Sequence, residues 1–338
     1  MIYTVLSNRF RNPTNGSASR FKLQMVNLPM PEVTVSMPAF NTADYIGAAI
    51  RSVLAQEDVD LELIVVDDAS GDNTVDIVKA FRDPRMRLLR NTERRGISFC
   101  HNRILDRSTS PFIAHVDSDD LILPGALRKL LDAVGSDPAV GQAHCHFIRV
   151  DRDGRTTREQ YRRLFQHLSK RNHGIDYRQE LMIGGSVMNA LRTYRREVFD
   201  SVGRFNEELR WHIDHEMGLR IADRYRFALV PEVLYCTRVH GTNTTATMRF
   251  KEPRFFLQRI AVWRAVMRSN RDHFLRKQPF GLAGLIAGRL RRLSRDAWRA
   301  LSPGPVPPFD PPLPNGVRLL PDGETLEVEV PGEETATR

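Results

Sequence analysis

Three carboxylates crowd the end of a short apolar run. Residues 112–116, Phe-Ile-Ala-His-Val, are followed at once by residues 117–120, Asp-Ser-Asp-Asp. An apolar run of this length predicts a buried strand, so the acidic residues lie where that strand leaves its sheet. Like charges at this spacing repel each other, and a divalent cation relieves the repulsion. The alternative is an acidic turn that caps the next helix, and the motif alone does not separate these two interpretations.

The part of the chain before this motif alternates strand and helix patterns. Strands are expected at 33–37, 61–66, 86–89 and 112–116. Helices are expected between them, at 42–55 with a cap from Asn41 or Thr42, at 75–81 and at 96–105. This alternation predicts an α/β fold with a mostly parallel sheet and right-handed crossovers.

The carboxyl ends of parallel strands open into one crevice, where the ligands of such sheets collect. Here those ends are the turns at 38–40, 67–68 and 117–120. A surface helix cap has no reason to share an edge with two other strand ends of this kind. The shared edge therefore favours a binding site at the acidic turn.

A predicted strand at 141–150 carries His144 and His146, which alternation places on one face. Two such histidines are either a metal pair or ordinary half-buried strand residues, and no further ligand at suitable spacing favours the metal. A strand ending at Tyr194 and a short helix at 196–201 follow.

Asp214 stands at the start of a later helical pattern. It either caps that helix, beside the positive end of the helix dipole, or acts as a general base in catalysis. Two more strands, expected at 227–230 and 234–239, complete the domain and lead into His240.

Composition and charge exclude several classes of protein. No apolar run approaches the ~18 residues of a transmembrane helix, and residues 1–10 lack the apolar core of a signal peptide, so we expect a cytoplasmic protein. Three widely spaced cysteines favour reduced thiols. The net charge is +9, but the strand ends are acidic and would repel phosphate without a metal, so we expect no nucleic-acid partner.

Most of the positive charge belongs to an appendage. Residues 249–299 contain 14 lysines and arginines and 3 acidic residues. Apolar residues recur there at helical spacing among the arginines, which predicts helices that pack on the core domain or a second subunit, or that lie on an anionic membrane surface. If these helices lie on a membrane surface, residues 249–301 would place the protein at the inner face of the membrane.

Changes in composition divide the chain into four predicted segments. Residues 1–30 form a flexible arm, 31–248 the core domain, 249–302 the basic helical segment and 303–338 a proline-rich acidic tail. We expect the tail to be disordered apart from a strand near 325–330.

Several pieces of the chain, in this order, resemble family 2 glycosyltransferases of the GT-A fold. They are residues 35–41, 64–74, Asn91 with Gly96 and Asn102, 115–120, 202–206, Asp214 and 238–240. The resemblance covers about 32–245. It implies a GT-A type fold with a C-terminal helical appendage and an inverting, hexosyltransferase-type enzyme that uses a nucleotide-sugar donor in polysaccharide or glycoconjugate biosynthesis.

The resemblance also implies roles for the matched residues. The nucleotide would be held by Pro38, Ala39, Phe40, Asp68, Gly96, Asn102, Asp117 and Ser118. Asp67, Asp120 and Arg238 would support the site. Asp117 and Asp119, with His240 nearby, would bind Mn²⁺ or Mg²⁺, since oxygen ligands suit both ions.

In members of this type, a carboxylate takes the proton of the acceptor hydroxyl while the nucleoside diphosphate leaves from the opposite face of the sugar. Asp214 matches that base. The chain has no Gln-x-x-Arg-Trp motif, which predicts transfer of one residue and not polymerisation. The acceptor would be a sugar, a lipid-linked or a protein hydroxyl group, and an oligomer is compatible with the sequence.

Two positions depart from the family pattern. Ile213 stands where the family often has Glu, which leaves Glu216 as a candidate second carboxylate. His101 stands where the family often has Arg, which puts a diphosphate contact from that position in doubt. The competing hypothesis is a catalytically degenerate nucleotide-sugar-binding or scaffold protein, and a variant of Asp214 distinguishes it from an enzyme.

Overall fold

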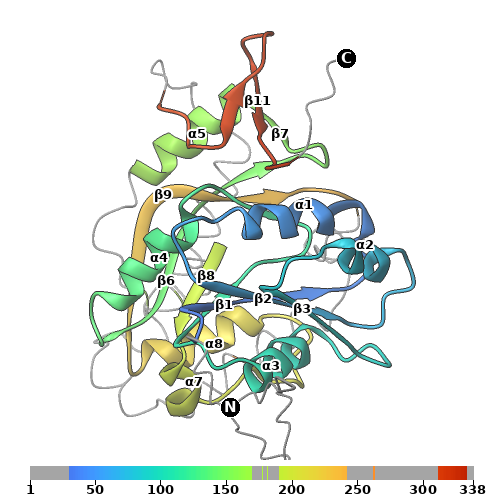
Figure 1. The fold of residues 1–338 in the computed structure, drawn as a ribbon. Helices are drawn as coiled ribbons and strands as arrows, with labels where there is room; N and C mark the ends of the chain where they lie inside the picture. Colours follow the sequence, from blue (N-terminus) through green and yellow to red (C-terminus); the bar gives the residue numbers. More distant parts are fainter. Residues whose placement is uncertain are drawn as a thin grey trace, which may run out of the picture.

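The computed structural model describes residues 30–169, 177, 181, 190–241, 262 and 311–332. Within these residues, the main element is an eight-stranded sheet in the order β3-β2-β1-β4-β8-β6-β9-β5. Helices cover both faces of this sheet, and a small second sheet lies beyond α1 (Figure 1).

One half of the main sheet is parallel. Its strands are β1 (Val33–Ala39), β2 (Leu61–Asp67), β3 (Met86–Arg90) and β4 (Phe112–His115). The helices between them are α1 (Ala43–Leu54), α2 (Thr74–Ala80) and α3 (Ile97–Arg107). The predicted βα units are confirmed here, with α1 and α2 on one face and α3 on the other (Figure 1).

The other half of the sheet is mixed. Its strands are β5 (Leu121–Ile122), β6 (Val140–Val150), β8 (Ala190–Arg195) and β9 (Arg226–Arg238). The accompanying helices are α4 (Ala126–Gly135), α7 (Glu197–Val202) and α8 (Ile213–Ala222). Strand β8 lies antiparallel between β4 and β6, which brings residues from the second half of the chain beside the acidic turn.

Alternating side chains of the parallel strands form two cores. Val35 and Leu63 pack with α1 and α4 on one face, whereas Ile64 and Val66 pack against α3 on the other. Strand β1 places Thr34 and Ser36 on the α3 face, where both are fully buried and hydrogen-bonded. The apolar runs at 33–37 and 61–66 are therefore strands with both faces covered.

Two details of the sheet differ from expectation. Pro38 does not end β1. On the side of β4, the last hydrogen bond of β1 is accepted by the carbonyl of Ser36, so the strand does not need an N–H from Pro38 there. The strands expected at 227–230 and 234–239 are one strand, β9, which continues through Pro231 and pairs with β6 on both sides of a register irregularity.

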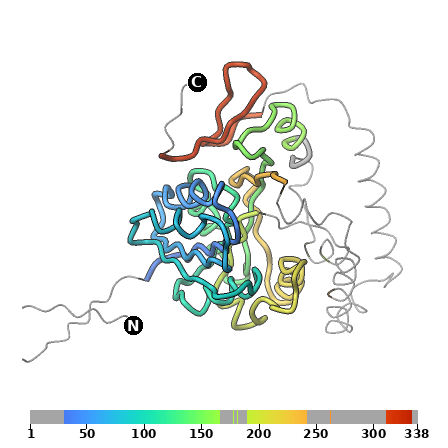
Figure 2. Tube along the Cα trace, turned by 90° about the vertical axis from the view of Figure 1, so that its right-hand side faces the viewer, coloured from blue at the N-terminus to red at the C-terminus, as the bar shows by residue number. Residues whose placement is uncertain are grey.

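The C-terminal segment forms a second sheet in the order β10-β11-β7. Its strands are β7 (Arg155–Thr157), β10 (Val317–Leu319) and β11 (Thr325–Val328), and α5 (Arg158–Ser169) follows β7 directly. Figure 2 shows the hairpin of β10 and β11 beside α5 at one end of the molecule. The predicted disorder is therefore wrong for residues 311–332, whereas the expected strand is present at Thr325–Val328.

An apolar cluster holds this hairpin on the main sheet. It includes Leu121, Ile148, Tyr161, Val233, Val317, Leu326 and Val328. At Gly316, with φ +79°, an added Cβ would lie 2.7 Å from Pro124 Cδ, so the backbone reaches this contact only without a side chain. The partners of the hairpin are distant in sequence, which is why composition alone predicts a disordered tail.

Two predicted segments lie outside the described residues: the arm before residue 30 and, except for Val262, the basic segment 249–302. The boundaries of the four segments stay predictions. In the described parts, none of the helices combines the length and apolarity needed to cross a membrane. Cys100, Cys145 and Cys236 are buried free thiols.

The packing of the hairpin predicts the effect of two leucine substitutions. Leu326 is 1% exposed and Leu319 is 39% exposed. We expect Leu326→Ala to lower the free energy of unfolding by about 2–5 kcal/mol, because it leaves a cavity, and Leu319→Ala to lower it by less than about 0.5 kcal/mol. Urea unfolding measures both, and equal effects would show that the hairpin does not pack as described.

Candidate active site

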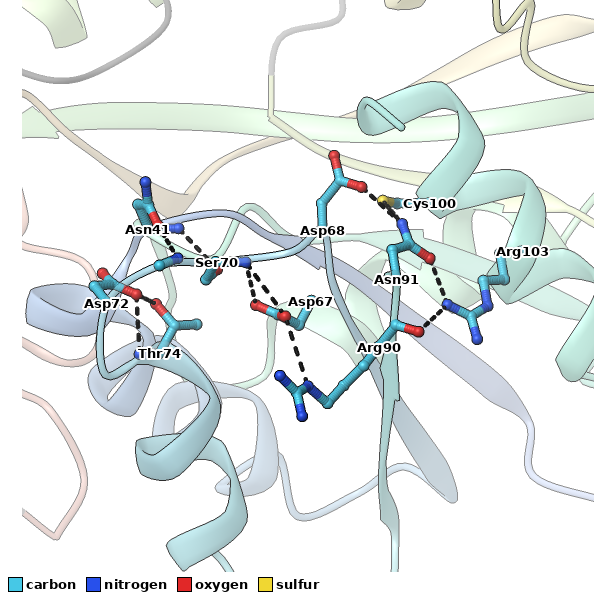
Figure 3. A network of polar contacts seen from close by, with 11 residues as sticks. Asn41, Asp67, Asp68, Ser70, Asp72, Thr74, Arg90, Asn91, Cys100 and Arg103 are labelled. Carbon is cyan, nitrogen blue, oxygen red and sulfur yellow. Dashed lines mark hydrogen bonds and ion pairs between the residues drawn. The ribbon is translucent and has the colours of Figure 1, made fainter. Parts of the chain in front are cut away.

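The loops that follow β1 and β2 are tied together by polar contacts (Figure 3). The backbone N–H of Asn41 donates to Ser70 Oγ (3.0 Å), and the backbone N–H of Gly71 donates to the side-chain Oδ1 of Asn41 (2.8 Å). Asp72 accepts a hydrogen bond from the Ala43 amide (3.1 Å) at the start of α1. The cap of α1 therefore comes from the neighbouring loop, and not from the side chain of Asn41 or Thr42 as expected.

The two aspartates at the end of β2 have different surroundings. Asp67 is fully buried, accepts a hydrogen bond from the Ser70 amide (3.3 Å) and lies 3.9 Å from Arg90 Nε. Asp68 accepts from Asn91 Nδ2 (2.7 Å) and from the amides of Arg95 and Gly96 (both 2.8 Å). These three donors hold the Asp68 carboxylate rigidly.

Gly96 and Phe40 lie close to this aspartate. Gly96, with φ +90°, immediately precedes α3. An added Cβ at Gly96 would meet nothing within 4 Å, so the backbone N–H that donates to Asp68 lies beside open space. The carbonyl of Ala39 accepts a hydrogen bond from the Asp68 amide (2.8 Å). The guanidinium of Arg94 lies 4.0 Å from the centre of the Phe40 ring and covers one of its faces.

The acidic turn after β4 is fixed to the end of β9. Asp120, 4% exposed, accepts a hydrogen bond from the Arg238 amide (2.8 Å). The Asp117 amide donates to the hydroxyl of Tyr235 (3.2 Å). His240 Nε2 lies 3.0 Å from Asp119 Oδ2. The turn therefore contacts Arg238 and His240, as the order of motifs predicts. The carboxylate of Asp120 joins the turn to the end of β9.

Aromatic and cationic groups surround His240. The ring of Tyr45, from α1, stacks on it with 4.3 Å between the ring centres. The guanidinium of Arg238 lies 5.6 Å from the centre of the same tyrosine ring. Tyr45 therefore limits the positions that the His240 ring can take. The sequence does not reveal this role, because Tyr45 fits the apolar face of a predicted helix.

Asp214, in the first turn of α8, is paired with a buried arginine. Arg192 Nη1 lies 3.1 Å from Asp214 Oδ2. Arg192 lies on β8, where Thr193 pairs with Ala114 of β4, so the guanidinium comes from beside the strand end that precedes the acidic turn. Asp214 and the turn are nearly a hundred residues apart in sequence. Arg192 connects them, because it contacts Asp214 and its charge acts on Asp117.

Burial and neighbouring charges change the pKa values of the turn. Burial raises the pKa of Asp117 to about 6, Arg192 opposes this change, and the charges of Asp119 and Asp214 add to it. Burial and the same acidic neighbours raise the pKa of Asp120 well above its usual value. Burial and acidic neighbours therefore make negative charge unfavourable in this turn.

Asn102 and Glu216 are hydrogen-bonded around the loop at residues 202–207. Asn102 Nδ2 donates to the Phe205 carbonyl (2.9 Å) and to Glu207 (2.8 Å), and its Oδ1 accepts from the Phe205 amide (3.0 Å). Glu216 is paired with Arg220 (2.7 Å), which also donates to the carbonyls of residues 202–204. A direct contact from Asn102 to nucleotide and a role of Glu216 as the second carboxylate stay predictions.

His101 forms a buried ring stack with His115. Their ring centres are 3.7 Å apart, and Ser36 Oγ lies 2.8 Å from His101 Nδ1. Burial lowers the pKa of His101 to about 3 and that of His115 well below its usual value. His101 is therefore neutral at pH 7, so this position supplies no positive charge to the site.

The predicted histidine pair on β6 is separated by a bulge. His144 contacts the hydroxyl of Tyr177 (3.2 Å), whereas His146 lies beside a cavity of about 260 Å³ that Tyr161 and Phe165 also line. In the described part of the chain, no group of three or more His, Cys, Asp and Glu side chains is arranged to hold a metal. This geometry does not favour a metal pair on β6.

Comparisons with known proteins identify the class of this fold and site. The family model described as "Glycosyl transferase family 2" matches residues 34–203, about half of the chain. An uncharacterized protein of Mycobacterium tuberculosis strain CDC 1551 is 32% identical over 247 residues, which cover 70% of this chain and 77% of the relative. The chain belongs to glycosyl transferase family 2 and is a glycosyltransferase of the kind that uses nucleotide sugars.

Two further comparisons agree with this assignment. The succinoglycan biosynthesis protein ExoO of Rhizobium meliloti is 40% identical over 132 residues, which cover 38% of this chain and only 37% of ExoO. The crystal structure of S. aureus TarS 1–349 with UDP-GlcNAc superposes with a TM-score of 0.55 at 18% identity, over 80% of this chain and 76% of TarS 1–349. This likeness confirms the predicted GT-A fold.

The contacts of Asn102 predict the result of a substitution. Asn102→Ala removes three hydrogen bonds and leaves the Phe205 amide without its acceptor, so we expect a loss of about 1–3 kcal/mol in the free energy of unfolding. Urea unfolding measures this loss. Asn206→Ala is the matched control on the same loop, where Oδ1 accepts from the exposed Glu208 amide only, and an equal loss in both variants would contradict the anchoring role.

Proposed function

We propose that this chain transfers one sugar from a nucleoside-diphosphate sugar to an acceptor hydroxyl group, with inversion at the anomeric carbon and Asp214 as the general base. One observation carries the proposal: Arg192 connects Asp214 to the acidic turn that follows β4. The acceptor is a sugar, a lipid-linked or a protein hydroxyl group. The base and the turn thus face the same crevice, as a displacement between donor and acceptor requires.

The donor would lie along the strand ends. Asp68 would accept a hydrogen bond from an N–H or O–H of the nucleoside, with Phe40 and Gly96, which precedes α3, beside it. The diphosphate would lie toward Asp117 and Asp119. Ser118, which the family resemblance assigns to nucleotide binding, is buried within this turn.

A divalent cation fits the acidic turn. Asp117 and Asp119 supply carboxylate oxygens, which Mg²⁺ and Mn²⁺ prefer, and His240 lies at hydrogen-bond distance from Asp119. Two carboxylates are the usual protein share of a site that the phosphates of the substrate complete. When bound, such an ion neutralises the charge that builds on the leaving phosphate oxygens.

A substitution of Asp214 distinguishes the hypothesis of an enzyme from that of a binding protein. We expect Asp214→Asn to lower the rate of nucleotide release from the accepted donor by about 100-fold or more, because the amide cannot take the proton. A thermal-shift panel of UDP-, GDP-, TDP- and CMP-sugars with Mn²⁺ identifies the donor and shows whether binding persists in the variant.

The matched control is Asp76→Asn, an exposed carboxylate in the first turn of α2, which should leave both readouts unchanged. Binding without nucleotide release in the wild-type protein would favour the competing hypothesis of a degenerate binding protein. Unchanged release in Asp214→Asn would reject Asp214 as the base.

The raised pKa of Asp117 predicts how cation binding depends on pH. A carboxylate must be ionised to bind the ion, and its pKa is about 6. We expect the affinity for Mn²⁺ to be about tenfold weaker at pH 5 than at pH 7.5, because only about a tenth of Asp117 is ionised one unit below its pKa. Electron paramagnetic resonance of free Mn²⁺ measures this, and Asp117→Asn should bind weakly at both values. Equal affinity of the wild-type protein at both pH values would contradict the assignment.

A further inference from the structure

Arg192 is a cation inside the protein, and sequence analysis does not select it. It is 9% exposed and lies on β8 between Leu191 and Thr193, which are both buried. A buried guanidinium is unfavourable unless a carboxylate pairs with it. The described contact that meets this need is the one with Asp214, at 3.1 Å.

The contact uses one oxygen of Asp214 and leaves the other. Oδ2 faces Arg192, whereas Oδ1 is shielded from solvent and accepts no hydrogen bond from any described residue. The Asp214 side chain as a whole is 41% exposed, so the carboxylate lies at the border between the buried guanidinium and solvent.

The start of α8 shows strain at the same place. His212, which precedes the helix, has φ +61°, a left-handed conformation that a residue with a Cβ rarely adopts. Such a conformation persists only when the surrounding contacts determine it, and it is common at functional sites. The strained backbone at His212 therefore lies two residues before the carboxylate that Arg192 contacts.

Three neighbouring basic groups are not suited to this role. His101 and His115, whose pKa values the charge of Arg192 lowers, are buried in their ring stack and neutral at pH 7. Arg220 is engaged by Glu216 and by the carbonyls of the 202–204 turn.

We propose that Arg192 is the positioning residue of the general base: its guanidinium holds Oδ2 of Asp214 and thereby fixes the orientation in which the carboxylate meets the acceptor hydroxyl group. This inference rests on the proposed function. In the step, the acceptor oxygen forms a bond to the anomeric carbon, and its proton moves to the Asp214 carboxylate. The bond from that carbon to the diphosphate breaks, and the electron pair leaves with the phosphate oxygen.

The test measures nucleotide release, with water as the acceptor, from the donor that the sugar-nucleotide panel identifies. We expect Arg192→Met to lower kcat by about 10- to 100-fold, because the base is misplaced. The affinity for the free nucleoside should change by less than about threefold, because the hydrogen bonds that hold Asp68 do not involve Arg192. Arg192→Lys keeps a cation near Oδ2 and should recover most of kcat. A variant with an unchanged kcat would overturn the inference.

A double variant separates positioning from a merely structural role. If Arg192 acts through Asp214, the protein with both Arg192→Met and Asp214→Asn should be no slower than Asp214→Asn alone. This variant also removes both charges together, so it leaves no unpaired buried ion to prevent folding. Multiplication of the two single effects would overturn the inference.

Arg195→Met is the matched control on the same strand. Its guanidinium donates to the carbonyls of Val134, Val140 and Asp137, away from Asp214, so kcat per folded molecule should not change. If the wild-type protein releases no nucleotide from any donor, the proposed function fails and this inference fails with it. If the wild-type protein turns over and Arg192→Met matches it, only the inference fails.

Discussion

The site depends on a balance of charge among partly buried groups. The turn after β4 and the start of α8 bring carboxylates together, and one buried guanidinium, Arg192, contacts Asp214 and acts electrostatically on Asp117. This cation opposes the rise in the pKa of Asp117 that burial and the charges of Asp119 and Asp214 cause. In the proposed function, a bound cation would relieve the same repulsion.

The topology of the sheet creates this balance. Strand β8 lies between β4 and β6, antiparallel to both, so a residue from the second half of the chain reaches the carboxyl edge of the parallel half. Strand β9 returns to the same edge and supplies Tyr235, Arg238 and His240 to the acidic turn. In the proposed function, the parallel half would hold the donor, and the mixed half would supply the base and its partner.

The parallel half could be predicted because its information is local. Apolar runs bounded by turns identify β1, β2 and β4, and the order of strand ends predicts a shared crevice. Arg192 could not be predicted, because its meaning depends on which strand β8 pairs with, and this pairing is not local. The contacts of Asn102 and Glu216 could not be predicted either: Asn102 bonds to Phe205, and Glu216 pairs with Arg220 of its own helix. The sequence predicts the strand near 325–330 but not its pairing with β7, because that partner is distant in sequence.

The second sheet sets the order in which the molecule can mature during synthesis. Strand β7, at Arg155–Thr157, has its partner at Thr325–Val328, so the two pair only after residue 328 has left the ribosome. Until then the outer apolar side chains around Tyr161 and Val233 lack their cover. A nascent chain that ends before residue 328 therefore exposes an apolar surface, and chaperones recognise surfaces of this kind.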